Sequence, residues 1–422
     1  MKFKKNLRIF ADAMKYNTFT LANGLRVIHE PLAAQVVYCG YGIYAGTRDE
    51  MAGKEGLAHF CEHTTFKGTA HRSASNILNS LESVGGDLNA FTNKENTFYH
   101  AAVMKKDVAK AVDLLTDLVF HATYPQNEIE KEVEVICDEI ESYNDSPSEL
   151  IYDEFDNLVF AGTPLGHNVL GTAERVRSFT TADALQFTAA HYRPGNMVFF
   201  ISGDVDFDRL VSRLERLTSD LPPSPIHVST PQESRLPAYE PQEIAVGRNT
   251  HQAHFITGCR TFSAFSDRKP ALWLLTNILG GTGMNARLNL TLRERNGLVY
   301  TVESFFGLYQ DTGVWTTYFG CDESDLRKCR RLMRREFDKL MDKPLSPAAL
   351  QTAKRQMYGQ LGIAADNRES NILAVARLYL KYGWLKSIEW QHEHIEAVTA
   401  EDIRQLAQDM LQEQHLTTLI FR

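Results

Sequence analysis

The pattern of apolar and polar positions divides the first half of the chain into short strands and longer helices. Residues 17–21 and 25–28 alternate on either side of Asn23-Gly24, and this combination predicts a β-hairpin. Residues 57–67 contain neither proline nor glycine, so a helix is allowed there. The other expected strands cover 36–44, 88–92, 96–103 and 197–202, and the other expected helices cover 73–84, 106–121, 126–143, 149–159 and 181–192.

The expected helix at 126–143 combines an apolar stripe with two carboxylates. The stripe recurs at helical spacing and consists of Ile129, Val133, Ile136 and Ile140. Glu132 and Glu139 are seven residues apart, which is two helical turns, so they share a face that borders the stripe. A carboxylate at the edge of a buried stripe is costly unless it has a partner. Either a cation lies beside this face, or both carboxylates are solvated.

A proline-rich segment separates the two halves of the chain. Six of the fourteen prolines fall between residues 222 and 241. A polar, proline-rich stretch of this kind is typical of a domain boundary. We therefore expect an N-terminal domain at 1–220, a linker at 221–242 and a C-terminal domain at 243–422.

The second half repeats the order of elements in the first half, at an offset near 220 residues. An expected strand at 313–319 leads into a helix at 323–340, as 96–103 leads into 106–121. Pro347 begins a long helix, as Pro125 does, and each half ends on a strand, at 197–202 and 416–421. The repeat predicts an α+β fold with two homologous domains, each an antiparallel-rich sheet packed against helices.

Composition excludes several classes of function. The chain of 422 residues has a formal net charge of −8 and no outstanding basic run, which argues against a nucleic-acid partner. No apolar stretch approaches the length of a membrane span. The start of the chain, residues 1–15, lacks the apolar core of a secretory signal. The six cysteines show no C-x-x-C spacing, so we expect reduced thiols and a cytoplasmic protein, with a periplasmic or organellar location as the alternative.

The stretch 59–63 carries the candidate chemistry. It reads H-x-x-E-H, the inverse of the H-E-x-x-H order that is usual in zinc peptidases. On a helix, His59, Glu62 and His63 occupy positions i, i+3 and i+4, which lie on one face. Two imidazoles one turn apart can bind a tetrahedral metal ion, and the carboxylate between them can act as a base beside it. The alternative is a helix with two surface histidines paired to a glutamate.

The internal repeat separates these two interpretations. Aligning Pro125 with Pro347 puts Lys354 at the place of Glu132 and Leu361 at the place of Glu139. The segment 270–281, which answers to H-x-x-E-H, contains no histidine. Residues needed only to build the fold would be expected in both copies, so this asymmetry favours a site in the first half.

These residues together resemble a known family, the pitrilysin-like inverzincin metallopeptidases, which include insulin-degrading enzyme and mitochondrial processing peptidase. The resemblance rests first on H-x-x-E-H followed by Glu139, 76 positions beyond His63. It extends to G-T-R-D-E at 46–50, G-G-D-L-N-A-F-T at 85–92, D-S-P at 145–147 and R-x-x-x-G-L-x-Y at 293–300. Asn296 differs from the basic residue that many relatives carry there. The length resembles the short bacterial class of two-domain chains.

The resemblance implies a role for each motif residue. His59, His63 and Glu139 would bind one Zn²⁺ per chain, Glu62 would act as the general base, and Glu132 would support the ligands from behind. Arg293 and Tyr300 would hold the substrate backbone and help to stabilise the tetrahedral intermediate. An extended peptide would add as a strand along the substrate-binding segment, which consists of Asn89, Ala90, Phe91 and Thr92.

The expected activity is zinc-dependent endopeptidase cleavage of short or unfolded peptides. The resemblance also implies a homodimer in which Arg293 and Tyr300 act on the zinc site of the partner, although a related second subunit could take the partner's place. One alternative is a structural subunit without activity, and retention of every motif residue argues against it. The other is a module that binds peptides without cleaving them, and Glu62, which is not a zinc ligand, argues for turnover.

Overall fold

The computed structural model describes residues 16–231, 236–248, 250–385 and 387–422. Residues 1–15, discussed above as a candidate signal, and the part of the expected linker at 232–235 lie outside the described residues. The chain forms two compact units. Unit 1 comprises Met1–Ile140, Asn168–Ser229 and Ala364–Ser387, and unit 2 comprises Glu141–His167, Thr230–Ile363 and Ile388–Arg422.

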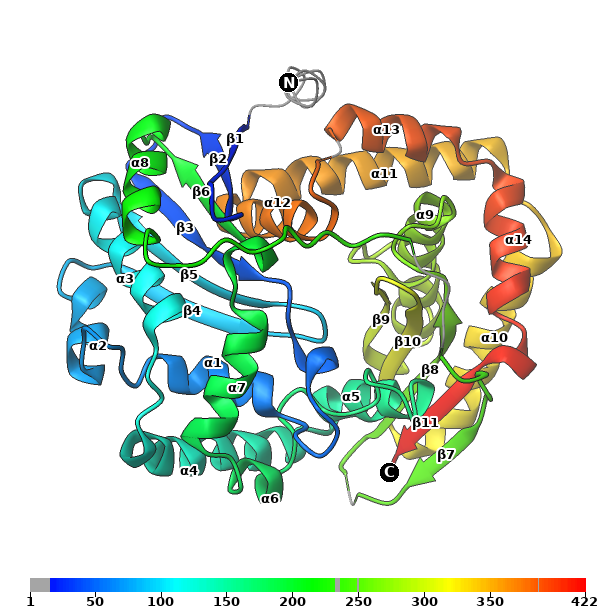
Figure 1. The fold of residues 1–422 in the computed structure, drawn as a ribbon. Helices are drawn as coiled ribbons and strands as arrows, with labels where there is room; N and C mark the ends of the chain where they lie inside the picture. The colour runs from blue at the N-terminus through cyan, green and yellow to red at the C-terminus, as the bar shows by residue number, and fades with distance from the viewer. Residues whose placement is uncertain (1–15, 232–235, 249, 386) are drawn as a thin grey trace. The chain divides into compact units, whose positions relative to one another are not determined.

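Unit 1 is built on a six-stranded mixed sheet with the order β1-β2-β6-β3-β5-β4 (Figure 1). Strands β2 and β6 are parallel, and every other neighbouring pair is antiparallel. The strands are β1 (Asn17–Thr20), β2 (Arg26–Pro31), β3 (Val36–Ile43), β4 (Asp87–Thr92), β5 (Thr97–Met104) and β6 (Met197–Gly203). The predicted hairpin is therefore the β1–β2 pair, and β4 lies at an edge of the sheet.

Helices cover both faces of this sheet, because consecutive strand residues point to opposite sides. On one face, Val27 and Phe199 pack in a core with residues of α1, α3, α4 and α7. On the other face, Ile28 and Phe200 pack against α12. The helices of this region are α1 (Leu57–Thr65), α2 (Ala74–Glu82), α3 (Val108–His121), α4 (Gln126–Asn144), α6 (Ala173–Val176), α7 (Thr181–His191), α8 (Phe207–Leu217) and α12 (Arg368–Tyr382).

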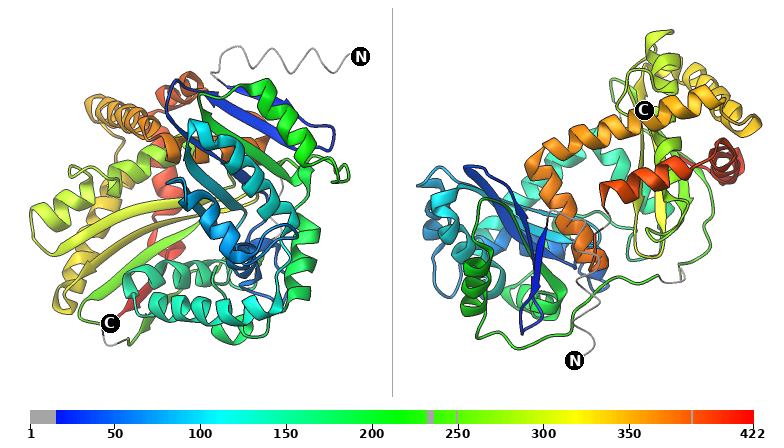
Figure 2. Two further views of the ribbon diagram at one scale, coloured as in Figure 1. Left: turned by 90° about the vertical axis from the view of Figure 1, so that its left-hand side faces the viewer. Right: turned by 90° about the horizontal axis from the view of Figure 1, so that it is seen from above.

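Unit 2 contains a five-stranded sheet with the order β7-β11-β8-β10-β9. Figure 2 shows the long strands β8, β9 and β10 side by side. The strands are β7 (Glu243–Val246), β8 (Ala253–Thr261), β9 (Val299–Leu308), β10 (Gly313–Cys321) and β11 (Thr417–Phe421). The helices are α5 (Pro147–Val159), α9 (Lys269–Gly280), α10 (Leu326–Asp342), α11 (Pro347–Asp366), α13 (Ile388–Ala397) and α14 (Ala400–Met410).

The strand order shows the predicted repeat directly. Strands β2-β6-β3-β5-β4 and β7-β11-β8-β10-β9 follow the same order, and each set has one parallel pair, β2 with β6 and β7 with β11. The α+β fold class with two related domains is therefore confirmed. Helix α9 follows β8 as α1 follows β3, and α9 contains no histidine.

The division into units is not a single division of the sequence. Helix α5 comes from the first half of the chain, and its Ile151 and Phe155 pack in a core with Ile256 and Leu419 of unit 2. Helix α12 comes from the second half, and it packs in unit 1. Each half of the repeat thus contributes one helix to the other unit. The proline-rich segment passes from unit 1 to unit 2 between Ser229 and Thr230.

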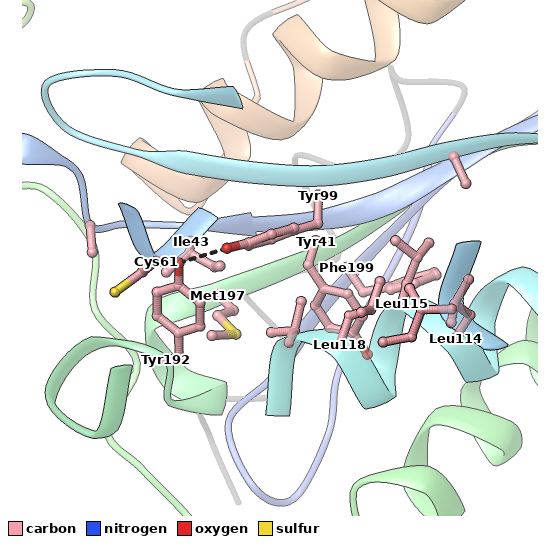
Figure 3. Packing of buried hydrophobic residues seen from close by; sticks show 14 of the residues in the cluster. Tyr41, Ile43, Cys61, Tyr99, Leu114, Leu115, Leu118, Tyr192, Met197 and Phe199 are labelled. Carbon is pink, nitrogen blue, oxygen red and sulfur yellow. Dashed lines mark hydrogen bonds between the residues drawn. The ribbon is translucent and has the colours of Figure 1, made fainter. Parts of the chain in front are cut away.

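A polar network fixes α1 to the core of unit 1. Figure 3 shows Cys61 of α1 close to Tyr99 and Tyr192, whose hydroxyls are 3.1 Å apart. The hydroxyl of Thr65, the last residue of α1, lies 3.1 Å from that of Tyr99 and 3.2 Å from that of Tyr124. Buried hydroxyls that satisfy one another restrict the packing to one arrangement. The position of α1 against the sheet is therefore well defined.

Two further expectations concern the whole chain. Among the described residues, no helix is both long and apolar enough to cross a bilayer. All six cysteines lie in the described part of the chain, where they are buried and free.

Candidate metal centre

Helix α1 presents the expected residues on one face, and α4 brings a carboxylate to them. The ring centroids of His59 and His63 are 4.6 Å apart. One ligand atom from each of His59, His63 and Glu139 lies within 4.8 Å of the other two. The Nε2 atoms of His63 and His59 lie 3.2 and 3.9 Å from Oε2 of Glu139. Three atoms that can bind a metal ion therefore face one another.

Glu132 lies behind this group. Its Oε1 is 3.1 Å from Nδ1 of His63, so the ring can donate from Nδ1 and leave Nε2 facing Glu139. Its Oε2 is 2.6 Å from the ammonium of Lys67, which balances the buried charge. A carboxylate that accepts from the far nitrogen of an imidazole fixes both the tautomer and the orientation of the ring. Lys67 was not a sequence-based candidate, although it is only four residues beyond His63, in the turn that follows α1.

Glu62 is buried next to the cluster, with 8% of its surface exposed. The hydroxyl of Thr92, at the end of β4, donates to its Oε2 at 2.5 Å. Thr92 was expected to contact substrate as part of the substrate-binding segment. In this structure its side chain also holds the predicted base in one orientation.

Protonation differs sharply between neighbouring groups. Burial raises the pKa of the Glu62 carboxyl to about 7. Burial and the adjacent His63 lower the pKa of His59. Burial acts in the same direction on His63, but hydrogen bonds with Glu132 and Glu139 outweigh it and raise the pKa of His63 to about 9. The hydrogen bond from His63 lowers the pKa of Glu139. At neutral pH, His59 is therefore neutral, His63 is charged and Glu139 is anionic.

The donor set fits zinc. Zinc in catalytic sites takes three protein ligands of the imidazole and carboxylate type and leaves a fourth position open. Two imidazole nitrogens and one carboxylate oxygen converge here, and the side chain of Glu139 is 46% exposed, so the cluster is open to small molecules. A divalent cation would also replace the proton on Nε2 of His63, which faces Glu139, and leave the Nδ1 proton with Glu132.

A residue outside the sequence-based candidates fixes the start of α1. Both oxygens of the Glu50 carboxylate accept backbone N–H groups at this end, from Gly56 at 2.9 Å and from Ala58 at 2.7 Å. The first N–H groups of a helix have no partner within the helix, and a negative charge there also interacts favourably with the helix dipole. Gly56 has φ of 98°, and an added Cβ would lie 2.8 Å from Cα of Gly171, so glycine is required.

The predicted substrate-binding segment, 89–92, belongs to β4. This strand pairs with β5 on one side only, with Asn89 opposite His100 and Phe91 opposite Phe98. An edge strand has unpaired backbone groups that can accept another strand. The amide of Asn89 donates to Asp87 at 2.9 Å.

Arg293 and Tyr300 belong to unit 2, whereas the metal cluster belongs to unit 1. Arg293 lies in a π-helical turn, Asn289–Glu294, and Tyr300 lies in the edge strand β9. The guanidinium carbon of Arg293 is 5.6 Å from the centre of the Tyr300 ring, which is a cation–π contact. Tyr300 is 81% exposed, so its hydroxyl is accessible.

Comparison with known proteins identifies the family. Residues 26–173 match the family described as insulinase (peptidase family M16), and residues 178–357 match the peptidase M16 inactive domain. An uncharacterized zinc protease of Bacillus subtilis is 30% identical over 404 residues, which cover 95% of this chain and 97% of that protein. The chain belongs to the M16 peptidase family. The resemblance predicted from H-x-x-E-H and its companion motifs is thereby confirmed.

Other M16 relatives agree with this assignment. An uncharacterized zinc protease of Mycobacterium tuberculosis is 33% identical over 403 residues, covering 95% of this chain and 92% of that protein. The crystal structure of a protease from Helicobacter pylori superposes with a TM-score of 0.87 at 21% identity, covering 97% of this chain and 99% of that one. A peptidase M16 inactive domain from Pseudomonas fluorescens superposes with a TM-score of 0.86 at 18% identity, covering 97% and 98%. The structural matches show the same fold over nearly the whole chain.

Proposed function

We propose that the protein is a zinc-dependent endopeptidase that hydrolyses short or unfolded peptides. The observation that carries the proposal is the cluster of His59, His63 and Glu139, with Glu62 buried beside it. Membership of a peptidase family, and relatives named zinc proteases, support it. The proposed stoichiometry is one Zn²⁺ per chain at this cluster.

When bound, zinc would polarise the scissile carbonyl and activate a water molecule for attack. Glu62 takes the proton from that water at its carboxylate and then delivers it to the leaving amine. Thr92 keeps Glu62 oriented, and Glu132 keeps the ring of His63 oriented. Each group thus acts from a position that does not have to change during the reaction.

The proposed substrate is an extended peptide. The free edge of β4 can pair with its backbone, and pairing of this kind recognises an extended chain more than any one side chain. Arg293 and Tyr300 would hold the substrate carbonyl as hydrogen-bond donors. The accessible hydroxyl of Tyr300 supports that role.

We further propose a homodimer in the cytoplasm, with Arg293 and Tyr300 serving the zinc site of the partner. The metal ligands belong to one unit and this pair belongs to the other, so a complete site needs both units. The six free, buried cysteines suit a reducing compartment.

The decisive experiment is cleavage of a mixed peptide library by the purified parent chain and by Glu62→Gln, with bound zinc measured in both. We expect the same zinc content in both proteins, including one ion per chain at this cluster, and a rate for Glu62→Gln that is lower by about 100-fold or more, since the base is lost and the ligands are kept. Glu130→Gln is the matched control, because Glu130 is an exposed residue of α4, and it should cleave as the parent does.

Other outcomes would lead to different conclusions. Cleavage that persists unchanged in Glu62→Gln would mean that this cluster is not the catalyst. Zinc in both proteins with cleavage in neither would contradict a self-sufficient peptidase and would favour a peptide-binding role or a second, related subunit. Peptide retention measured on the same library would then separate those two alternatives.

A further inference from the structure

A second group of metal-binding side chains lies in unit 1, where the loop after α1 meets the end of α3. His71 is in that loop, and Asp117 and His121 are one turn apart on α3. One ligand atom from each lies within 4.8 Å of the other two. Within the part of the chain that the structure describes, only this group and the His59–His63–Glu139 cluster have this arrangement.

The spacing suits a tetrahedral ion. Oδ1 of Asp117 lies 3.3 Å from Nδ1 of His121 and 2.6 Å from Nδ1 of His71. Ligand atoms of a tetrahedral zinc ion are about 3.3 Å apart, given bonds of about 2.0–2.1 Å. The pair from α3 already has that separation. His71 would have to move outward by roughly 0.7 Å to match it, and its side chain is 61% exposed, so it has room to do so.

Each ligand on α3 is held from behind by a further residue. Oδ2 of Asp117 accepts a hydrogen bond from Thr69 at 2.7 Å and another from Arg72, which leaves Oδ1 toward the two imidazoles. Nε2 of His121 lies 3.2 Å from the carboxylate of Asp220, so the ring can donate there and keep its lone pair on Nδ1. Hydrogen bonds of this kind orient metal ligands. The charge of Arg72 is directed to the oxygen that does not face the imidazoles.

One atom of the group is left unsatisfied by the protein. Nδ1 of His121 is buried and has no hydrogen-bond partner among the described residues, since its contact with Asp117 lacks the geometry of a hydrogen bond. A buried polar atom without a partner is unusual in a folded protein. A simple ion-pair cluster accounts for Asp117 but not for this nitrogen. A bound cation would account for both.

We propose that His71, Asp117 and His121 bind a divalent transition-metal ion of the zinc type, with water completing its coordination. Two imidazoles and one carboxylate favour such an ion over Mg²⁺ or Ca²⁺. The ion would enter from a surface cleft of about 690 Å³ that His71 and Arg72 line together with Lys67 and Thr69. It would join the loop at 69–73 to the end of α3. The proposal does not depend on the peptidase activity.

Equilibrium dialysis of the full chain against buffered Zn²⁺ tests this site. The parent should bind two zinc ions, and a variant with both His59→Ala and His63→Ala should still bind one. His71→Gln should lose one ion relative to the parent, because it removes an exposed ligand without disturbing the core. His251→Gln replaces an exposed histidine outside both groups and should bind as the parent does.

Thermal unfolding supplies a second readout. In the variant lacking His59 and His63, zinc should raise the melting temperature, and adding His71→Gln should abolish that rise. Zinc binding that is unchanged in His71→Gln would overturn the proposal, and so would a parent that binds one ion while the variant lacking His59 and His63 binds none. If His71→Gln loses one zinc ion but the variant lacking His59 and His63 loses none, the proposed catalytic centre would be contradicted and the second site would still be supported.

Discussion

The hydroxyl of Thr92 holds one oxygen of the Glu62 carboxylate at 2.5 Å. If Glu62 is the base, the other oxygen is free to take a proton, and the hydroxyl decides where it points. Thr92→Val keeps the volume and removes the donor. Since a hydrogen bond to a charged group contributes about 1.5–3 kcal/mol, we expect kcat to fall roughly 10- to 100-fold. KM should change little, because the backbone of β4 remains available to substrate.

Thr92→Ser distinguishes this role from packing. It restores the hydroxyl and removes a methyl group, so steady-state kinetics on one cleaved peptide should return it to near the parental kcat. A loss in Thr92→Ser as large as that in Thr92→Val would show that the methyl group, which only Thr92→Val keeps, matters as much as the hydroxyl. A rise in KM with kcat unchanged would instead assign Thr92 to substrate binding, as the sequence suggested.

The raised pKa of His63 predicts how zinc binding at the proposed catalytic cluster depends on pH. Hydrogen bonds with Glu132 and Glu139 outweigh burial and raise its pKa to about 9, whereas the pKa values of His59 and Glu139 are lowered. Only His63 must therefore lose a proton before it binds zinc at neutral pH. At pH values below the His63 pKa of about 9, zinc affinity should fall by up to about tenfold for each unit by which the pH is lowered. Competition with a chelator at about pH 6 and pH 8 measures this.

The matched variant for this prediction is Glu132→Gln. It removes one of the charges that hold the proton on His63, so the pH dependence of zinc affinity should weaken over the same range. Zinc affinity that is equal at both pH values in the parent chain would contradict the protonation states assigned to the cluster.

At the scale of elements, α1 depends on the carboxylate of Glu50. Glu50→Ala leaves the N–H groups of Gly56 and Ala58 without that acceptor. Loss of a helix cap costs about 0.5–2 kcal/mol, so denaturant unfolding should show a loss in this range. Zinc affinity should also fall, since α1 carries both imidazoles.

The control for this prediction is Glu134→Ala, which removes an exposed carboxylate 3.5 Å from Arg177 and should change stability by less than about 0.5 kcal/mol. Equal effects of the two substitutions would show that the cap is unimportant.

The helical period explains why part of the site could be predicted from sequence. Positions i, i+3 and i+4 of any helix share a face, so His59, Glu62 and His63 had to come together once α1 formed. The contact of Glu50 with the start of α1 depends on how the intervening loop folds, and no short spacing rule describes it. The pairing of Glu139 with α1 joins elements far apart in sequence. The apolar stripe indicated only that a cation could lie beside Glu139, and the family resemblance implied its role as a metal ligand.

Helices α5 and α12 each pack in the unit formed mainly by the other half of the chain, and the sequence pattern could not predict this. An apolar stripe predicts that a helix packs against something, but it does not identify the sheet. The chain passes from unit 1 to unit 2 within the proline-rich segment, between Ser229 and Thr230, yet nothing in the pattern of α5 assigns its Phe155 to the core with Leu419. Helices α8 and α12 and strands β7 and β9 lie in stretches to which the patterning assigned no element.

At the scale of the whole molecule, the proposed homodimer makes a prediction about which chain provides Arg293 and Tyr300 to each proposed metal cluster. The ligands and this pair belong to different units. In a homodimer, each cluster could work with the pair of its own chain or with that of the partner. Two kinds of subunit distinguish these arrangements, one with a defective metal cluster and one with a defective Arg293–Tyr300 pair. In a mixed dimer, the intact cluster and the intact pair belong to different chains.

We expect mixing of His63→Ala and Arg293→Ala subunits to restore activity that neither has alone. In an equal mixture half of the dimers are mixed, and in each of these one of the two sites combines an intact cluster with an intact arginine. About one quarter of the parental activity should therefore return. If the pair acted within its own chain, every site would lack one component and no activity would return. Sedimentation analysis must first establish the dimer, and differently tagged subunits purified as the mixed species should raise the yield to about one half.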